Sequence, residues 1–267
     1  MLSSLYHDFL YYPLLNTLVF FYNVFGDLGL AIIVLTVLVR LVLYPVAKKS
    51  LQHQKSLKKI QPKIKALQEE YKDDKEKLTA EMMNLYKEHN FNPASGCLPL
   101  IIQFIILITL YRVFMAGFHL DSNQLYSFIP HPSNFDTHFL GTFDLSQKSL
   151  AINFSKLFSK EGIQVFSIGG TILALFASLA QFYQTKMTIR KSLKQKELEE
   201  SLAKEKPEGK EKEEQIDMTE IMNTQMLYFF PLLTFYIGAT LPSGLALYWS
   251  VSTLLLIGQQ YLLDKKE

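Results

Sequence analysis

The stretch from Leu28 to Lys49 constrains the fold of this chain most, because nearly all of its residues are apolar. Its length of about twenty residues lets a helix cross a bilayer core of roughly 30 Å. Arg40 lies well inside this run. A guanidinium at the centre of a membrane-spanning helix costs on the order of 3 kcal/mol. We therefore expect Arg40 to face protein, water or a bound partner.

Four further apolar runs have the length of spanning helices, and charged or polar segments separate them. The sequence therefore predicts an all-α membrane protein with five transmembrane helices. The predicted helices are 28–47, 97–117, 163–185, 225–241 and 242–262. The remaining segments are an outer-face helix at 1–27, a cytoplasmic helical hairpin at 48–96, an outer loop at 118–162, a charged cytoplasmic linker at 186–224 and a short cytoplasmic tail at 263–267.

Basic residues are distributed unevenly among these segments, although the net charge of the chain is only +2. Lysines follow directly behind the first apolar run, and the linker opens with Lys186, Arg190, Lys191 and Lys194. The region before Leu28 has no Lys or Arg. Because cytoplasmic loops carry the excess of Lys and Arg, we predict that the N-terminus lies outside. Segments 48–96 and 186–224 and the C-terminus then lie in the cytoplasm.

Residues 1–27 carry polar and apolar side chains at helical spacing. The polar residues recur on one side of a helix, and leucine, valine and phenylalanine cover the other; the polar set is Asp8, Tyr12, Asn16, Asn23 and Asp27. This pattern predicts an amphipathic, interfacial helix on the outer face of the membrane. A sixth spanning helix is the alternative.

Segment 48–96 has helix signals on both sides of a turn. Apolar residues recur at helical spacing in each arm, which predicts an antiparallel hairpin; they are Ile60, Ile64, Leu67 and Tyr71 before the turn and Leu78, Met82 and Leu85 after it. Asp73 as N-cap with Glu76 three residues later fits a capping box for the second arm. Pro62 should kink the first arm or mark a restart.

The hairpin also carries a basic face, formed by Lys55, Lys58, Lys59, Lys63 and Lys65. Such a run of lysines has two equally good explanations. It can form a solvated surface, or it can contact anionic lipid headgroups or ribosomal RNA. The sequence leaves both interpretations open.

The position of Arg40 within the apolar run is compatible with two placements of its side chain. Its long side chain can extend toward the cytoplasmic interface, because Lys48 follows about 12 Å further along a helix. Alternatively, Arg40 lines a water-filled cavity. No predicted span contains Asp or Glu, so a buried guanidinium would need water or a transient anion.

The other polar side chains singled out within the predicted spans are uncharged: Thr36, Gln103, Gln181, Gln184, Tyr248 and Trp249. Such side chains most often hold helices together, but gathered around Arg40 they would line a hydrated groove. The lack of carboxylates disfavours an ion-coupled transporter or channel for small solutes. No catalytic pair supports an intramembrane protease, and no phosphate-binding loop supports nucleotide hydrolysis.

Cysteine and histidine give no sign of a metal or redox site. Cys97 is the only cysteine, so no disulfide framework exists, and we expect it to act as a small apolar residue at a helix start. His119, His131 and His138 lack the spacing of a metal site and should lie on the surface. The sequence thus predicts no metal, no cofactor and no enzymatic reaction.

Four stretches together resemble the YidC membrane insertases and their organellar relatives. They are GLAIIVLTVLVRLVLYPVAKKS at 29–50, the segment 60–103 that ends in NPASGCLPLIIQ, LAQFYQTKM at 179–187, and MLYFFPLLTFYIGATLPSGLALYWSVSTLLLIGQQYL at 226–262. They include parts of all five predicted spans and of the hairpin, in the order found in that family. The outer loop 118–162 is longer than the resemblance leads one to expect.

The resemblance implies five helices around a hydrophilic groove that is open to the cytoplasm, with Arg40 as its charge. It implies an insertase and chaperone for nascent membrane proteins in a bacterial plasma membrane. Membrane lipids, the ribosome, signal recognition particle components and the Sec translocon are the implied partners, and DNA is not one. Thr36, Gln103, Gln181, Gln184, Tyr248 and Trp249 become the implied groove residues. The hairpin would receive substrate.

Overall fold

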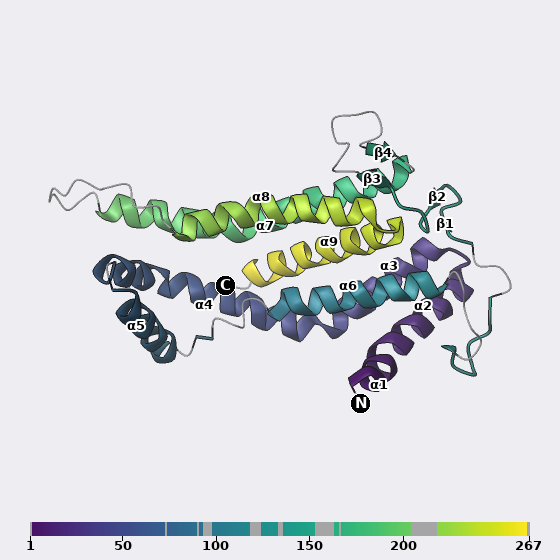
Figure 1. Ribbon diagram of the computed structural model, residues 1–267, viewed down its shortest axis with the longest axis horizontal. Helices are drawn as coiled ribbons and strands as arrows, with labels where there is room; N and C mark the ends of the chain where they lie inside the picture. The colour runs from purple at the N-terminus through teal and green to yellow at the C-terminus, as the bar shows by residue number, and fades with distance from the viewer. Residues whose placement is uncertain are drawn as a thin grey trace. The chain divides into compact units, whose positions relative to one another are not determined.

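The computed structural model describes residues 2–72, 74–89, 91–92, 98–117, 124–132, 136–152, 163–165, 167–203 and 218–265. These residues are mostly helical, as predicted from the sequence (Figure 1). The helices are α1 (Leu2–Tyr6), the π-helical η1 (His7–Tyr11), α2 (Tyr12–Phe25), α3 (Leu28–Val42), α4 (Tyr44–Glu70), α5 (Lys75–Glu88), α6 (Leu98–Gly117), α7 (Ile168–Ala203), α8 (Met218–Thr240) and α9 (Ser243–Lys265).

Two short antiparallel strand pairs accompany the helices. The strand β1 (His138–Phe139) pairs with β2 (Phe143–Asp144), and β3 (Leu150–Ile152) pairs with β4 (Ile163–Val165). The chain divides into two compact units, one formed by Met1–Val39 with Thr109–Glu267 and the other by Arg40–Ile108.

In the second unit, the first predicted span is broken. Helix α3 ends at Val42, and α4 starts at Tyr44 with Pro45 in its first turn. The prediction of one continuous helix over 28–47 is therefore wrong in its last turn. Proline has no backbone N–H to continue the helical hydrogen bonds, and its ring clashes with the preceding turn. The segments Leu28–Val42 and Tyr44–Gln52 meet at a bend of 56°.

The helical hairpin of this unit consists of α4 and α5, which pack through a small apolar core. Ile60, Ile64, Leu85 and Phe91 are buried there, largely the residues that the periodicity indicated. Pro62 lies inside a single continuous helix, so no restart occurs.

The cap of α5 differs from the predicted one. Asp74, not Asp73, is the N-cap and accepts a hydrogen bond from the backbone N–H of Lys77 at 3.1 Å. Asp73 lies outside the described residues. Because the third helical position holds Lys77 rather than Glu76, the capping box with Glu76 is wrong as well.

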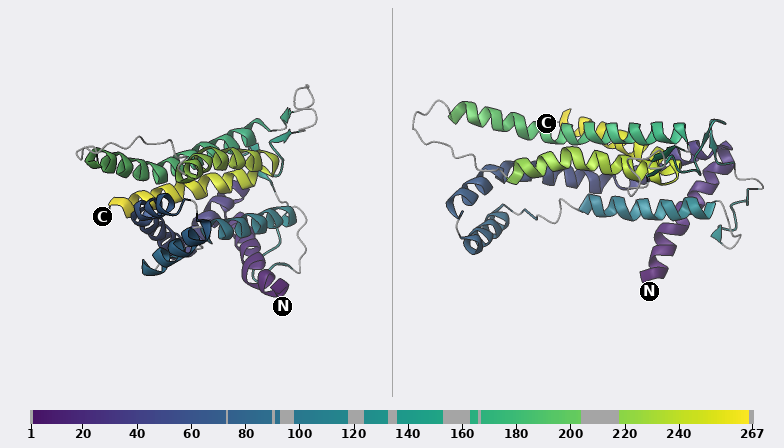
Figure 2. Two further views of the ribbon diagram at one scale, coloured as in Figure 1. Left: turned by 60° about the vertical axis from the view of Figure 1, so that its left-hand side comes forward. Right: turned by 45° about the horizontal axis from the view of Figure 1, so that its top comes forward.

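The first unit contains a bundle of α7, α8 and α9. Helices α7 and α8 run side by side in both views of Figure 2, and α9 packs against α7. Small residues allow these helices to approach closely, since Ala174, Ala239 and Ala246 are fully buried between them. Within α8, the carbonyl of Pro231 accepts a hydrogen bond from Ser178 on α7 at 2.9 Å.

The third predicted span, 163–185, begins too early. Residues 163–165 form strand β4, and helix α7 starts at Ile168. Ser167 stops the helix from extending backwards, because its hydroxyl oxygen accepts a hydrogen bond from the N–H of Gly170 at 3.1 Å, as an N-cap does. At its other end α7 extends to Ala203, well into the predicted linker.

One polar residue of the N-terminal helix α2, Asn16, is covered by protein rather than by water. Asn16 is buried, and its amide donates to the carbonyl of Gln124 and accepts from the N–H of Tyr126. The exposed residues of α2 include the apolar Phe20 and Val24 as well as the polar Asn23. The predicted interfacial helix thus has at least one polar residue, Asn16, whose hydrogen-bonding partners come from the loop 118–162.

By length and apolar composition, no single helix among the described residues suffices to cross a membrane. Helix α3 taken together with Tyr44–Gln52 does suffice by the same measure, across the 56° bend.

Candidate functional site

The Arg40 side chain binds the side chain of Gln103 within the second unit. Nη2 of Arg40 donates to Oε1 of Gln103 at 2.8 Å, and both side chains are half-buried. Arg40 is on α3 and Gln103 on α6, so the bond joins two helices that are 63 residues apart in sequence. Two residues that the sequence analysis assigned to one groove are thus brought together.

Thr36, Tyr248 and Trp249 lie in the first unit. Thr36 is fully buried, and its hydroxyl donates to the carbonyl of Ile32, one turn earlier, at 2.6 Å. Tyr248 is also buried, whereas Trp249 is half-buried. In this unit, Thr36 therefore has the role of a polar residue that is satisfied by its own helix.

Gln181 and Gln184 are the start of a polar ladder on α7. Nε2 of Gln181 donates to Oε1 of Gln184 at 3.1 Å. One turn further, the hydroxyl of Thr188 donates to the backbone carbonyl of Gln184. The same hydroxyl oxygen lies 3.3 Å from Nε2 of the buried Gln260 on α9. Thr188 and Gln260 are not among the predicted groove residues, although Thr188 follows Gln184 by one helical turn and so shares its face.

The predicted basic face of the hairpin lies along α4. Lys63 is exposed, and its Nζ is 3.0 Å from Nε2 of His89, which follows α5. The side chains of Lys55, Lys58, Lys59 and Lys65 lie outside the described residues, as do Cys97 and His119.

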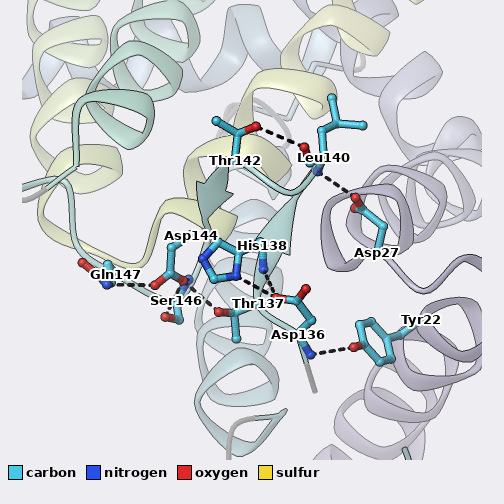
Figure 3. Close-up of polar contacts among 10 residues, drawn as sticks. All are labelled: Tyr22, Asp27, Asp136, Thr137, His138, Leu140, Thr142, Asp144, Ser146 and Gln147. Carbon is cyan, nitrogen blue, oxygen red and sulfur yellow. Dashed lines mark hydrogen bonds and ion pairs between the residues drawn. The ribbon is translucent and has the colours of Figure 1, made fainter. Parts of the chain in front are cut away.

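The described part of the loop 118–162 is held to α2 and to the residue before α3 by hydrogen bonds from its backbone (Figure 3). The N–H of Asp136 donates to the hydroxyl of Tyr22 at 2.6 Å, and that of Leu140 donates to Oδ2 of Asp27 at 2.8 Å. The polar residues that precede the first span therefore bind the loop.

Asp144 organises the loop from within. Its Oδ1 accepts from the hydroxyl of Thr137 and from both the N–H and the hydroxyl of Ser146, and its Oδ2 accepts from Nε2 of Gln147. Partial burial would raise the pKa of Asp144, but the hydrogen bonds outweigh it and lower that pKa below 3.8. Nearby, Nδ1 of exposed His138 donates to Oδ1 of Asp136 at 2.7 Å, and this hydrogen bond raises the pKa of His138 above its ordinary value.

The β1–β2 hairpin also places two aromatic rings on glycines. Phe139 lies against Gly29 at the start of α3, and Phe143 lies against Gly169 at the start of α7. A Cβ at either glycine would overlap the ring that covers it. One short hairpin therefore connects the N-terminal ends of α3 and α7 in the first unit.

Comparison with known proteins identifies the family. The family described as 60Kd inner membrane protein matches residues 20–267. The chain belongs to this family. Proteins named membrane protein insertase YidC from Pelobacter propionicus and Granulibacter bethesdensis are 30% identical to it over 253 and 257 residues. The predicted membership of the YidC family is thereby confirmed, and it fits the predicted membrane location.

A solved structure shows the same fold. The crystal structure of an active YidC insertase, with its first transmembrane domain resolved, matches this chain with a TM-score of 0.53 at 24% identity. That match covers 97% of this chain and 46% of the other. The YidC relatives from the two bacteria are likewise longer, since the alignments cover 95% of this chain and 38% of each relative.

Within the described part of this YidC-family chain, no group of three or more His, Cys, Asp or Glu residues could hold a metal ion. Two polar arrangements are present among the described residues: a guanidinium that donates to a neutral amide in one unit, and an amide and hydroxyl ladder in the other.

We expect Asp144→Asn to make the YidC-family chain less sensitive to acid. Because the pKa of Asp144 is lowered in the folded state, its contribution to stability is present above the ordinary pKa of 3.8 and is lost as the pH falls through the lowered value. The variant cannot titrate there, and it keeps the acceptor oxygen but loses the bond from Gln147. It should lose about 1 kcal/mol at neutral pH.

Thermal unfolding of purified protein in detergent, measured from about pH 7 to pH 3, tests this expectation. Glu88→Gln, at an exposed carboxylate on α5, is the matched control. An acid-induced loss of stability as steep in Asp144→Asn as in the wild type would contradict the assignment.

Proposed function

We propose that this chain is a membrane protein insertase and chaperone for nascent membrane proteins. The hydrogen bond of 2.8 Å between Arg40 and the amide of Gln103 carries the proposal, because it places a half-buried cation beside a second polar side chain between two apolar helices. The names of the YidC relatives support the same conclusion.

In the proposed mechanism, five spanning helices surround a hydrated groove that opens to the cytoplasm. Thr36, Gln103, Gln181, Gln184, Tyr248 and Trp249 line it together with Arg40. The groove shortens the apolar distance that a polar tail must cross, and the guanidinium offsets part of the cost of removing an acidic tail from water. Burial of about twenty apolar substrate residues in lipid then drives insertion without nucleotide hydrolysis.

The proposed orientation follows the distribution of lysine and arginine. The N-terminus and the loop 118–162 lie outside, and the hairpin and the C-terminus lie in the cytoplasm. The lysine face of the hairpin would contact anionic lipid headgroups and the ribosome. Signal recognition particle components and the Sec translocon are further proposed partners.

Reconstitution tests the function directly. The purified protein is placed in liposomes and supplied with a single-span substrate that carries a short acidic outer tail, and insertion is measured by protection of the tail from protease. We expect more protected substrate than in protein-free liposomes of the same composition. Equal protection with and without the protein would refute the insertase function, and solute flux or substrate cleavage would favour a transporter or a protease instead.

A further inference from the structure

Residues 136–150 form a strap across the first unit, and the proposed function gives this strap no role. Two of its aromatic rings lie against Gly29 on α3 and Gly169 on α7. The carbonyl of Leu145 accepts a hydrogen bond from the N–H of Gly244 on α9 at 3.0 Å. All three contacts fall in the first residues of these helices. The strap therefore joins the starts of three of the predicted spans.

Leu145 lies at the centre of these contacts and is only 1% exposed. Gly244, which binds its carbonyl, also faces two other helices. A Cβ on Gly244 would lie 3.2 Å from the side chain of Ile32 on α3, 3.4 Å from that of Phe114 on α6 and 3.5 Å from the carbonyl oxygen of Leu145. Close packing of this kind leaves little room for water between the strap and the helices.

The backbone of the strap is paired with the helices beside it. The N–H of Ser149 donates to the carbonyl of Ala239 on α8 at 3.1 Å, and the N–H of Ser243 on α9 donates to the carbonyl of Gln147 at 3.0 Å. Buried side-chain N and O atoms without a hydrogen-bonding partner occur at three described residues, and none of these lies in the strap. The strap thus adds apolar bulk and leaves few polar groups to bind water.

We propose that the strap 136–150 is a permeability seal, which stops protons and small ions at the end of the bundle where α3, α7 and α9 begin. This inference rests on the proposed insertase function, because a hydrated groove that opens to one side of a membrane needs a barrier toward the other side. Packed side chains such as Leu145 exclude water, and paired backbone groups cannot replace the hydration shell of an ion.

Leu145→Ala tests the seal, with Leu140→Ala as the matched control on the same strap. Leu140 is 65% exposed, so its side chain contributes little packing. Proteoliposomes with an entrapped pH-sensitive dye receive an acid step outside, and proton influx above that of protein-free liposomes is measured. We expect influx to rise at least about tenfold in Leu145→Ala, because loss of a packed leucine shifts an equilibrium by more than that factor. Leu140→Ala should stay within about twofold of the wild type.

Leu145→Met separates packing from any other role of this position. Methionine has nearly the volume of leucine and usually replaces it with little loss of packing. We expect proton influx in Leu145→Met to stay close to that of the wild type. Influx raised as far in Leu145→Met as in Leu145→Ala would contradict a seal made by packing.

A pair of cysteine variants reads the access of water to the strap directly. Leu145→Cys and Leu140→Cys are each made with Cys97→Ser, so that each protein has one thiol. A membrane-impermeant maleimide is added outside the proteoliposomes. We expect Leu145→Cys to react at least about tenfold more slowly, since a buried thiol is inert. Both positions lie on the strap, so a mixed orientation of the protein affects them equally.

The outcomes separate the seal from the function on which it rests. Equal proton influx in wild type, Leu145→Ala and Leu140→Ala would overturn the seal, as would equal reaction of the two thiols, which decides the question where Leu145→Ala does not fold. Insertion of a single-span substrate, measured in the same liposomes, should stay within about twofold in Leu145→Ala. A wild type that inserts no substrate would overturn the insertase function, while the influx comparison still decides the seal.

Discussion

Arg40→Ala should reduce insertion of an acidic-tailed substrate by about tenfold or more. A hydrogen bond to a charged group contributes about 1.5–3 kcal/mol, and each 1.4 kcal/mol corresponds to a factor of about ten. Arg40→Lys should retain most of the activity, because an ammonium is also a cation and can donate to Oε1 of Gln103. The measurement is protease protection of the substrate tail in proteoliposomes, compared among the three proteins at equal amounts.

The matched control for Arg40 is a second arginine outside the proposed groove. Arg112 is an exposed residue on α6, and its guanidinium lies 5.5 Å from the centre of the Tyr6 ring. Arg112→Ala should leave the preference for acidic tails unchanged. If wild type, Arg40→Ala and Arg40→Lys insert the acidic-tailed substrate equally well, Arg40 is only an anchor that extends toward the interface.

The sequence identified Arg40 and Gln103 as groove candidates but could not predict the bond between them. Charge and burial cost select an arginine inside an apolar run, and these depend on local sequence alone. Whether Gln103 meets Arg40 depends on how α3 and α6 pack, which involves positions 63 residues apart. The same limit explains why Thr188 and Gln260 were missed.

The outer loop shows this limit more strongly. Its bonds to Tyr22 and Asp27, and its rings on Gly29 and Gly169, all join distant parts of the chain. The helical period of residues 1–27 predicts one polar side, but periodicity does not reveal whether water or protein covers each residue on it. Local sequence signals also locate a helix end only to within a residue or two. The sequence therefore predicts the N-cap of α5 at Asp73, whereas it is Asp74.

Gly170→Ala should destabilise the first unit by about 2–4 kcal/mol, because no space exists for a methyl group at this position. A Cβ on Gly170 would overlap the hydroxyl oxygens of Ser149 and Ser243 and would lie 3.1 Å from Cβ of Ser243. Both serines are buried, their oxygens are 3.1 Å apart, and that of Ser243 also donates to the carbonyl of Gln147 at 2.8 Å. Moving them aside breaks the contact between the outer loop and the turn that precedes α9.

Gly258→Ala is the matched control, since it is another helical glycine and nothing lies within 4 Å of its added Cβ. Alanine there should leave stability unchanged or raise it by up to about 1 kcal/mol, because alanine favours a helix over glycine. Thermal unfolding of both variants in the same detergent separates the effect of steric overlap on stability from the effect of helix propensity.

If the hydroxyls cause the loss of stability, Gly170→Ala should cost less in a Ser149→Ala, Ser243→Ala background than in the wild type. An equal cost in both backgrounds would show that the overlap is not with the hydroxyls and that this contact does not hold the loop.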